Sequence, residues 1–436
     1  YNTGDSDNYY CILPPLYLVA DRRIRCSTFV MLVFLESALY FRRAICQSFN
    51  LRLHFKNMNT KITFYPVLNG DCSLIEFANG QKMMFDCNFR GDAEDENNDD
   101  YNVIKDLLEN KLKGTHKGLP YLDAFVLTHP DQDHCRGFKD KFFQGKNPET
   151  KDGAPSKSDK DNKLILIGEL WHSPRVFSEN TNELSEDAKA FKKEAQRRMK
   201  LYEENSSDKD KPGNRIRIIG YADVDALDNI PSEVISAAGD TVKKLNGKTL
   251  SDFRFFVHAP FKDSIKDDNR NATSIVLQIR VDEGDKSDVG RIVLGGDSEW
   301  RVWKKIMEKT SDDNNLKWNL LEAPHHCSYH FFADNRDNEP EQSSLDFLAK
   351  RINKGYVVSS SKTIKQNNDN PPCQKAKNRY IKSLNDKEDY FKCTTVDDVQ
   401  NPVIFEVKSD GIHLVEETEQ KKETKSAIGG REHIYG

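Results

Sequence analysis

The segment Thr128–His134 (THPDQDH) places four side chains of metal-binding types within six residues. Imidazole nitrogens and carboxylate oxygens are common ligands of Zn²⁺ and related divalent ions. The segment follows the apolar stretch Leu122–Leu127, which we predict to be a strand. A tight loop after a strand directs alternate side chains to one point and its terminal Asp-His pair to a second. We therefore expect two neighbouring divalent ions, bound by His129, Asp131, Asp133 and His134.

Two further apolar strands are predicted to end at an aspartate. Met83–Phe85 runs into Asp86, and Ile292–Leu294 runs through two glycines into Asp297. The glycines allow close approach of the backbone, and the carboxylate of Asp297 can bridge two cations. We expect these strand ends to meet the Thr128–His134 segment at one sheet edge.

Histidines follow two other predicted strands. The stretch Leu320–Pro324 leads to His325 and His326. Adjacent residues of an extended chain point to opposite sides, so we expect one of this pair to bind metal and the other to support it or contact substrate. His172 follows the strand Leu164–Ile167 by a few residues. It is either a further ligand or a buried histidine that caps the strand.

The order of these motifs resembles that of the metallo-β-lactamase superfamily of metal-dependent hydrolases. The two motifs THPDxDH and APHHxS are most similar to the hydrolase domain of bacterial DNA-uptake competence proteins and its stand-alone relatives. The resemblance spans about Met58 to Val415. It implies an α/β fold, specifically a four-layer αββα sandwich with charged insertions.

The resemblance also implies roles for individual residues. Asp86 organises the site without binding metal, and Asp297 bridges the ions. The remaining ligands implied are His129, Asp133, His134, one of His325 and His326, and, as the middle histidine, His172.

The chain departs from the family pattern at three places. Asp131 replaces the second histidine of the central motif, as in the competence-like branch, and its added negative charge favours Mn²⁺ or Mg²⁺ beside Zn²⁺. Cys327 stands where the relatives have glycine, and Asn370-Pro371 stands where they often have His-Pro. No membrane channel accompanies the domain, so DNA transport is not implied.

These observations predict a metal-dependent hydrolase that uses a metal-bound hydroxide, with Asp133 orienting the water and Asp297 holding the ions together. The expected cofactors are two divalent ions, Zn²⁺ first and Mn²⁺ or Mg²⁺ as alternatives. The expected substrate is a phosphodiester or related ester, and the resemblance to the competence-like domain implies a nucleic acid or nucleotide. Basic side chains that we expect near phosphates are Arg197, Arg198, Lys200, Lys304, Lys305 and Lys309.

Three alternatives stay open. The same chemistry would act on a lactone, lactam or thioester if the pocket were apolar. A metal-bound interaction module without catalysis is the second alternative. Cysteine-based catalysis is the third, because Cys327 and Cys135 each adjoin a histidine.

The composition limits the class of protein. The chain has 436 residues, with 65 Lys and Arg against 70 Asp and Glu, which excludes a strongly basic coat for nucleic acid as a global property. Nine cysteines in no framework spacing indicate free thiols and a cytoplasmic, reducing environment. The longest apolar run is far too short to span a membrane. Protein partners are not indicated.

The composition changes at Met58. Residues 1–57 are rich in Arg and cysteine, whereas later residues prefer Lys, Asp and Asn. We interpret 1–57 as an atypical segment that is either not native or outside the fold, 58–415 as the hydrolase domain and 416–436 as a polar tail. Charged insertions are expected at 145–163, as a surface loop, and at 184–213, which includes a helix.

The pattern of elements predicts a mixed α/β fold with mainly antiparallel strands, in layers rather than as a doubly wound sheet. The predicted strands are Lys61–Leu68, Ser73–Phe77, Lys82–Phe85, Leu122–Leu127, Leu164–Ile167, Arg215–Ile219, Phe253–His258, Ser274–Val281, Arg291–Leu294, Trp318–Ala323, Tyr356–Ser359, Pro402–Val407 and Gly411–Val415, and the predicted helices are Tyr101–Leu112, Ser185–Glu204 and Trp300–Lys309.

Overall fold

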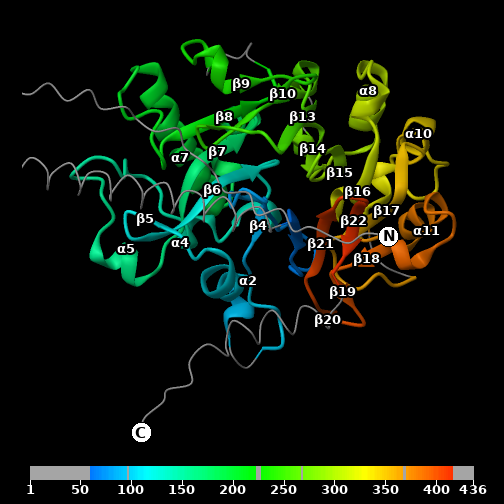
Figure 1. The fold of residues 1–436 in the computed structure, drawn as a ribbon. Helices are drawn as coiled ribbons and strands as arrows, with labels where there is room; N and C mark the ends of the chain where they lie inside the picture. The colour runs from blue at the N-terminus through cyan, green and yellow to red at the C-terminus, as the bar shows by residue number, and fades with distance from the viewer. Residues whose placement is uncertain (1–58, 96–97, 222–226, 267–268, 367–369, 416–436) are drawn as a thin grey trace, which may run out of the picture. The chain divides into compact units, whose positions relative to one another are not determined.

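The strands of the protein form two large mixed sheets, and most of its helices pack beside them (Figure 1). The computed structural model describes residues 59–95, 98–221, 227–266, 269–366 and 370–415. The predicted segment 1–57 and the predicted tail 416–436 lie outside the described residues. No helix within the described ranges is long and apolar enough to cross a membrane.

The first sheet has ten strands and joins the start of the described chain to its end. Its order is β22-β21-β1-β2-β3-β6-β7-β8-β9, with β5 paired to β6. Strands β22 to β3 pair antiparallel, whereas β3, β6, β7, β8 and β9 run parallel. The strands are β1 Lys61–Phe64, β2 Ser73–Glu76, β3 Lys82–Phe85, β5 Thr115–His116, β6 Leu119–Leu127, β7 Leu166–His172, β8 Arg215–Ile219, β9 Ile235–Ser236, β21 Val403–Lys408 and β22 Gly411–Leu414.

The second sheet has seven strands in the order β10-β13-β14-β15-β16-β17-β18. Strands β10 to β15 are antiparallel and β15 to β18 are parallel. The strands are β10 Thr241–Val242, β13 Phe253–Ala259, β14 Val276–Glu283, β15 Lys286–Leu294, β16 Trp318–Glu322, β17 Arg351–Ser359 and β18 Phe391–Cys393. The prediction of mainly antiparallel strands is therefore wrong for the parallel half of each sheet.

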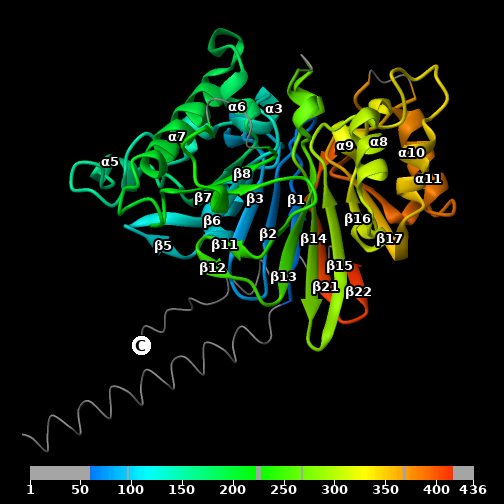
Figure 2. The ribbon, with the colours of Figure 1, turned by 90° about the horizontal axis from the view of Figure 1, so that it is seen from above.

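The two sheets share one apolar core. Buried side chains from both, including Phe77 and Val126 of the first sheet and Phe253 and Leu277 of the second, belong to a single cluster. The rings of Phe77 and Phe253 stack with centroids 3.6 Å apart. Because side chains alternate along a strand, each sheet also turns an apolar face away from this core. Figure 2 shows helices beside both sheets, α7 on one side and α8, α10 and α11 on the other.

The outer face of the first sheet is covered by helices that precede and follow its parallel strands. The buried side chains of α7 pack with Phe125 and Leu170 of that sheet. Here Phe191 of α7 lies 6.1 Å from the ring of Phe125. Helix α7 is therefore part of the core, and its interpretation as an inserted element stays a prediction. The helices on this side are α2 Val103–Asp106, which continues as a π-turn Leu107–Lys111, α3 Gln132–Cys135, α4 Phe138–Lys141, α6 Arg175–Ser178 and α7 Glu186–Glu203.

The outer face of the second sheet is covered in the same way. Trp303 of α8 and Tyr380 of α11 are fully buried against Val293, Leu321 and Val357 of the sheet. These helices are α8 Trp300–Lys309, α10 Gln342–Leu348 and α11 Gln374–Ser383. The sequence pattern predicted only α8. Parallel neighbours such as β16 and β17 need a crossover connection, and α10 lies in that connection.

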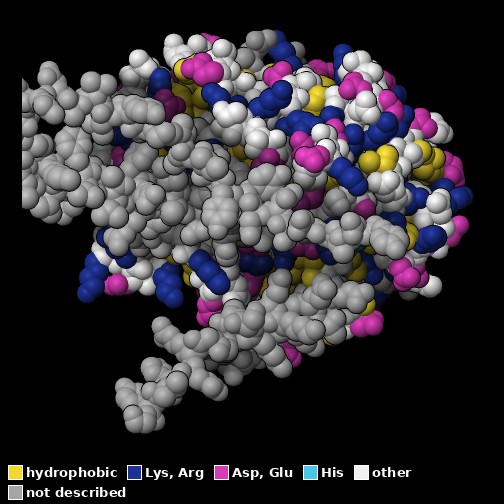
Figure 3. Space-filling view, viewed as in Figure 1, with side chains coloured by type: hydrophobic (Ala, Val, Ile, Leu, Met, Phe, Trp, Pro, Cys, Tyr) yellow, Lys and Arg dark blue, Asp and Glu magenta, His cyan; other side chains and the backbone are white. Residues whose placement is uncertain are grey.

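The predicted loop 145–163 also contains a helix, α5 Lys157–Asp161. Ser156 caps it, because its hydroxyl accepts from the Asp159 amide while the Asp159 carboxylate accepts from the Ser156 amide. The sequence showed no helical repeat of apolar residues here, because α5 buries no side chain. Over the part of the surface drawn in colour in Figure 3, basic and acidic side chains are interspersed, consistent with the nearly balanced composition.

Candidate metal centre

The predicted site residues lie at the carboxyl ends of parallel strands. Asp86 follows β3, and His129 follows β6, its parallel neighbour. In the second sheet Asp297 follows β15, and His326 follows β16, which is parallel to β15. The carboxyl ends of parallel strands open onto the same edge of a sheet, so two such edges supply the residues of one centre.

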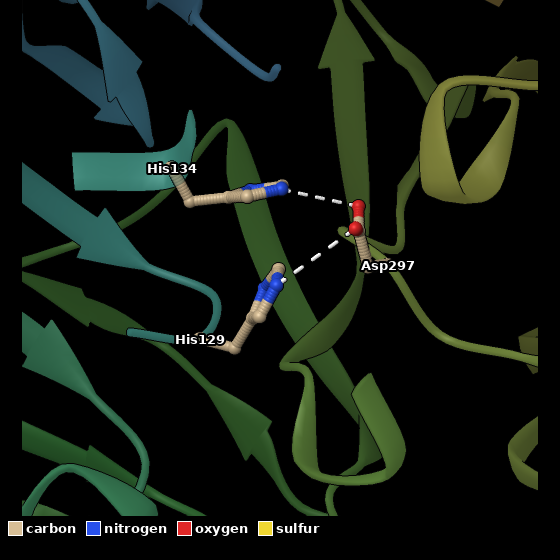
Figure 4. Close-up of side chains that lie close together, drawn as sticks. All are labelled: His129, His134 and Asp297. Atoms are coloured by element: carbon tan, nitrogen blue, oxygen red, sulfur yellow. Dashed lines mark ion pairs between the residues drawn. The ribbon is translucent and has the colours of Figure 1, made fainter. Parts of the chain in front are cut away.

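Three buried histidine nitrogens converge on Asp297, in addition to Nε2 of the partly exposed His325. The Nε2 atom of His134 lies 3.1 Å from its Oδ1 atom, and that of His129 lies 3.8 Å from Oδ2 (Figure 4). The Nε2 atom of His326 lies 3.4 Å from Oδ1. All three nitrogens and Oδ1 of Asp297 are buried without a hydrogen-bond partner among the described residues. Such convergence of unpartnered atoms is unusual in a protein interior, and these atoms could hold a cation.

The other ring nitrogen of His134 is held by Asp86. Carboxylate Oδ2 of Asp86 lies 2.8 Å from Nδ1 of His134, and it also accepts from the Thr128 hydroxyl at 2.5 Å. The Thr128 amide donates to Oδ1 at 2.7 Å. An anionic Asp86 places the proton on Nδ1, which leaves the Nε2 lone pair facing the centre. The predicted organising role of Asp86 agrees with this geometry.

His129 and His326 follow the same rule. Nδ1 of His129 lies 3.2 Å from the Thr128 hydroxyl oxygen, and Nδ1 of His326 lies 3.1 Å from Oδ1 of Asp71. Asp71 is a further residue of this cluster that the sequence analysis missed, because its segment between β1 and β2 resembles an ordinary polar turn. In the structure Asp71 is buried, with 4% of its surface exposed.

Asp133 and Asp131 are placed differently. Oδ2 of Asp133 lies 3.4 Å from Nε2 of His326, within a group of three potential ligands that also includes His134. Asp131 lies 3.6 Å from Nε2 of His129, but its other oxygen accepts from Arg270 at 2.9 Å. Arg270, which the sequence analysis did not single out, therefore shares the carboxylate predicted to bind metal.

The His325-His326 pair is not extended. Both residues and Cys327 have left-handed backbone angles, with φ of 54°, 51° and 65°. The expectation that an extended chain points the two side chains to opposite sides is therefore wrong. Residues other than glycine adopt this conformation at a cost of about 1–3 kcal/mol each, which is typical of functional sites. In this turn His326 is buried at the centre, while His325 lies 3.4 Å from Oδ2 of Asp297 and also faces Glu299.

His172 belongs to none of the potential ligand groups found within the described ranges. Its ring packs against Phe177 and Phe191, and its Nδ1 lies 3.2 Å from the carbonyl oxygen of Ser173. Burial lowers the pKa of His172 to about 4, so it is neutral at pH 7. These contacts favour the second interpretation, a buried histidine at the strand end.

The cysteines adjoining the histidines are buried. Burial raises the pKa of Cys135 and of Cys327 above the ordinary value, which disfavours the nucleophilic thiolate. All six cysteines of the described residues are free thiols, as the sequence predicted for them.

The electrostatics of the centre require positive charge. Burial opposes ionisation of Asp297, but the nearby histidines outweigh it and hold the pKa of Asp297 well below its usual range. Burial likewise opposes the charged form of His134 and His326, yet neighbouring carboxylates raise the pKa of both. Burial, with Asp71 and Asp86 nearby, raises the pKa of the buried Glu322. In the absence of another cation, protons on the histidines balance the carboxylates.

The donor set fits a divalent transition ion. Around a tetrahedral ion with bonds of about 2.0–2.1 Å, ligand atoms lie about 3.3 Å apart, close to the separations of 3.1–3.8 Å about Asp297. Imidazole and carboxylate together suit Zn²⁺ and Mn²⁺.

Compared with models of protein families and with curated proteins, the chain matches none.

Proposed function

We propose that the protein is a metal-dependent hydrolase of phosphodiesters and that its stacked sheets, with helices outside, are the four-layer αββα sandwich of the metallo-β-lactamase superfamily. The observation that carries the proposal is the convergence of three histidine Nε2 atoms on Asp297. In each of these histidines the Nδ1 atom faces an oxygen. A bound cation would give these three nitrogens and the buried carboxylate a common partner, which none of them has among the described residues.

The residues of the centre would have two kinds of role, metal binding and orientation of the histidine rings. His129, His134, His326 and Asp297 would hold two divalent ions, and Asp71 and Asp86 keep the rings in the ligating tautomer. A bound divalent ion would lower the pKa of a coordinated water and polarise the phosphoryl oxygen under attack.

Asp133 is the residue best placed to act on the nucleophile. Its side chain is about one-third exposed, so it reaches the solvent side of the centre. Burial opposes its ionisation, but His134 and His326 lower the pKa of Asp133 to about 2, so it is a carboxylate at neutral pH. A carboxylate in this position can accept a hydrogen bond from the attacking water and orient it.

A polar pocket beside the centre supports a phosphodiester over a lactone or thioester. It has a volume of about 750 Å³ and a wholly polar lining of two arginines, three carboxylates, three asparagines and one serine. Arg270 bonds Asp131 and Glu179 at 2.9 Å each, and its guanidinium can turn to a phosphoryl oxygen. Apolar acyl substrates would bury little apolar surface here.

Some of the basic residues predicted to contact phosphates are buried or already paired. Arg198 is fully buried and donates to Glu194 and to backbone carbonyls, so the prediction is wrong for it. Arg197 is bound to Glu194 and Asn214. Lys200, Lys304 and Lys309 are exposed, and Lys305 pairs with Asp263. Contact of the exposed lysines with nucleic acid stays a prediction, as does a cytoplasmic location.

The test is metal content and hydrolysis by the purified full chain. We expect bound Zn²⁺ or Mn²⁺, hydrolysis of bis-p-nitrophenyl phosphate and cleavage of short DNA or RNA. His134→Ala and Asp133→Ala should each lower the rate by at least the roughly 10- to 100-fold known for loss of a ligand's supporting partner. His413→Gln, in the hairpin of β21 and β22, is the matched control and should keep the wild-type rate.

The alternatives give different results. Hydrolysis of a chromogenic lactam or thioester but of no phosphodiester would favour the acyl alternative. Bound metal with no hydrolysis of either class would favour a non-catalytic module. Absence of bound metal, or a wild-type rate in His134→Ala, would overturn the proposal.

A further inference from the structure

A second group of potential ligands lies at the rim of the centre. It consists of Glu299, which directly precedes α8, and His325 and His330 from the turn after β16. Oε1 of Glu299 lies 3.5 Å from Nδ1 of His330 and 4.0 Å from Nδ1 of His325. The three side chains are 14–33% exposed, so a solvated ion can reach them.

The Nδ1 atoms of the two histidines are the nitrogens of this group that are available to an ion. Nδ1 of His325 and Nδ1 of His330 are buried atoms without a hydrogen-bond partner among the described residues. Both face the same carboxylate oxygen at distances longer than a hydrogen bond. The carboxylate itself is fixed from the other side, because Asn271 donates to Oε1 at 3.3 Å and Asn269 donates to Oε2 at 3.2 Å. Amide donors of this kind orient metal-binding carboxylates.

We propose that Glu299, His325 and His330 form an outer divalent-cation site, separate from the ions held about Asp297. Two imidazole nitrogens and one carboxylate oxygen are a donor set for Zn²⁺ or a similar transition ion rather than for Mg²⁺ or Ca²⁺. Ligand atoms of such an ion lie about 3.3 Å apart, so the separations of 3.5 and 4.0 Å close by less than 1 Å on binding. A solvent molecule would complete the coordination.

The outer site also gives the adjacent residues His325 and His326 different roles. A neutral imidazole offers one lone pair, so His325 bound through Nδ1 carries its proton on Nε2. That nitrogen lies 3.4 Å from Oδ2 of Asp297 and can donate toward it. His326, whose Nδ1 faces Asp71, then supplies the lone pair to the centre. The outer ion therefore orients a donor to the carboxylate that holds the central ions.

The test is the number of Zn²⁺ ions bound by the full chain, measured by native mass spectrometry and by titration against a chromophoric chelator. We expect His330→Gln and Glu299→Gln each to bind one ion fewer than the wild type. His413→Gln, an equally partly exposed histidine paired with Asp410, should bind the wild-type number. The variant His134→Ala, which disrupts the centre, should still bind one ion.

Equal stoichiometry in the wild type, His330→Gln and Glu299→Gln would overturn the outer site, as would complete loss of zinc from His134→Ala. Thermal unfolding of each protein in EDTA shows whether it folds. If His330→Gln does not fold, Glu299→Gln decides the stoichiometry alone. The outer site does not depend on the proposed hydrolase activity. A protein that binds the extra ion but hydrolyses nothing would refute the activity and leave the outer site standing.

Discussion

Replacement of Asp86 by asparagine tests the organisation of the centre. The carboxylate accepts three hydrogen bonds, from the Thr128 amide, the Thr128 hydroxyl and Nδ1 of His134. The amide of Asp86→Asn has one acceptor oxygen, which can keep the bond to the Thr128 amide. Its NH₂ group then faces Nδ1 of His134, where two donors meet.

The imidazole relieves this conflict by moving its proton to Nε2, the nitrogen that faces Asp297. Nε2 then has no lone pair for a metal ion. Metal can bind only if the proton returns to Nδ1, where it again faces the NH₂ group of the asparagine. We expect the affinity for Zn²⁺ to fall about 10- to 100-fold, which is about 1.4–2.7 kcal/mol. The affinity is measured by competition with a chromophoric chelator at pH 7.5.

The matched control is Asp106→Asn, the same chemical change at a carboxylate of α2 that accepts from the Tyr65 hydroxyl at 2.8 Å. It should leave the zinc affinity within about twofold of the wild type. An Asp86→Asn protein that folds and binds zinc as tightly as the wild type would refute the tautomer argument, and with it the role of Asp86.

Three further substitutions test other parts of the structure. Burial lowers the pKa of His172 from 6.5 to about 4, so the stability it contributes is present above pH 6.5 and lost as pH falls toward 4. This term is about 3 kcal/mol, and His172→Phe should remove it from the pH dependence measured by urea unfolding at pH 7 and 4.5 while leaving the zinc stoichiometry unchanged. Gly296→Ala places Cβ 2.7 Å from a threonine hydroxyl at φ +48° and should cost about 1–3 kcal/mol in urea unfolding, whereas Gly284→Ala, at φ +61° with open space around it, should cost less. Arg198→Met removes one of the two arginines paired with the buried Glu194 and should lose about 1.5–3 kcal/mol of stability, and a loss below 1 kcal/mol would contradict a core position for α7.

Much of the sheet structure could be predicted from the sequence because apolar strands alternate with clear turn signals. The meander of β1, β2 and β3 and the hairpin of β21 and β22 are formed by local contacts, and the structure confirms them. The parallel halves could not be predicted in the same way. Their pairings depend on crossover helices such as α10, whose short apolar stripe gave no signal.

Helix α7 shows the limit of composition as evidence. Its charged residues indicated an insertion, but they gave no sign that Glu194 and Arg198 are buried together as an ion pair. Burial of a charged side chain depends on its partner, and the partner of Arg198 also includes backbone carbonyls of Ile167 and Arg215 from distant strands. Only the assembled sheet supplies those carbonyls.

The sequence by itself determined which residues could bind metal, because ligand types at strand ends follow from local pattern. It named His129, Asp133, His134 and Asp297, and the structure brings these together. Tertiary structure alone decided which nitrogen of each histidine faces the centre, since the tautomer depends on contacts with Asp71, Asp86 and Thr128 from other segments. It also separated His326 from His325, because the left-handed turn after β16 sends two adjacent side chains to different partners.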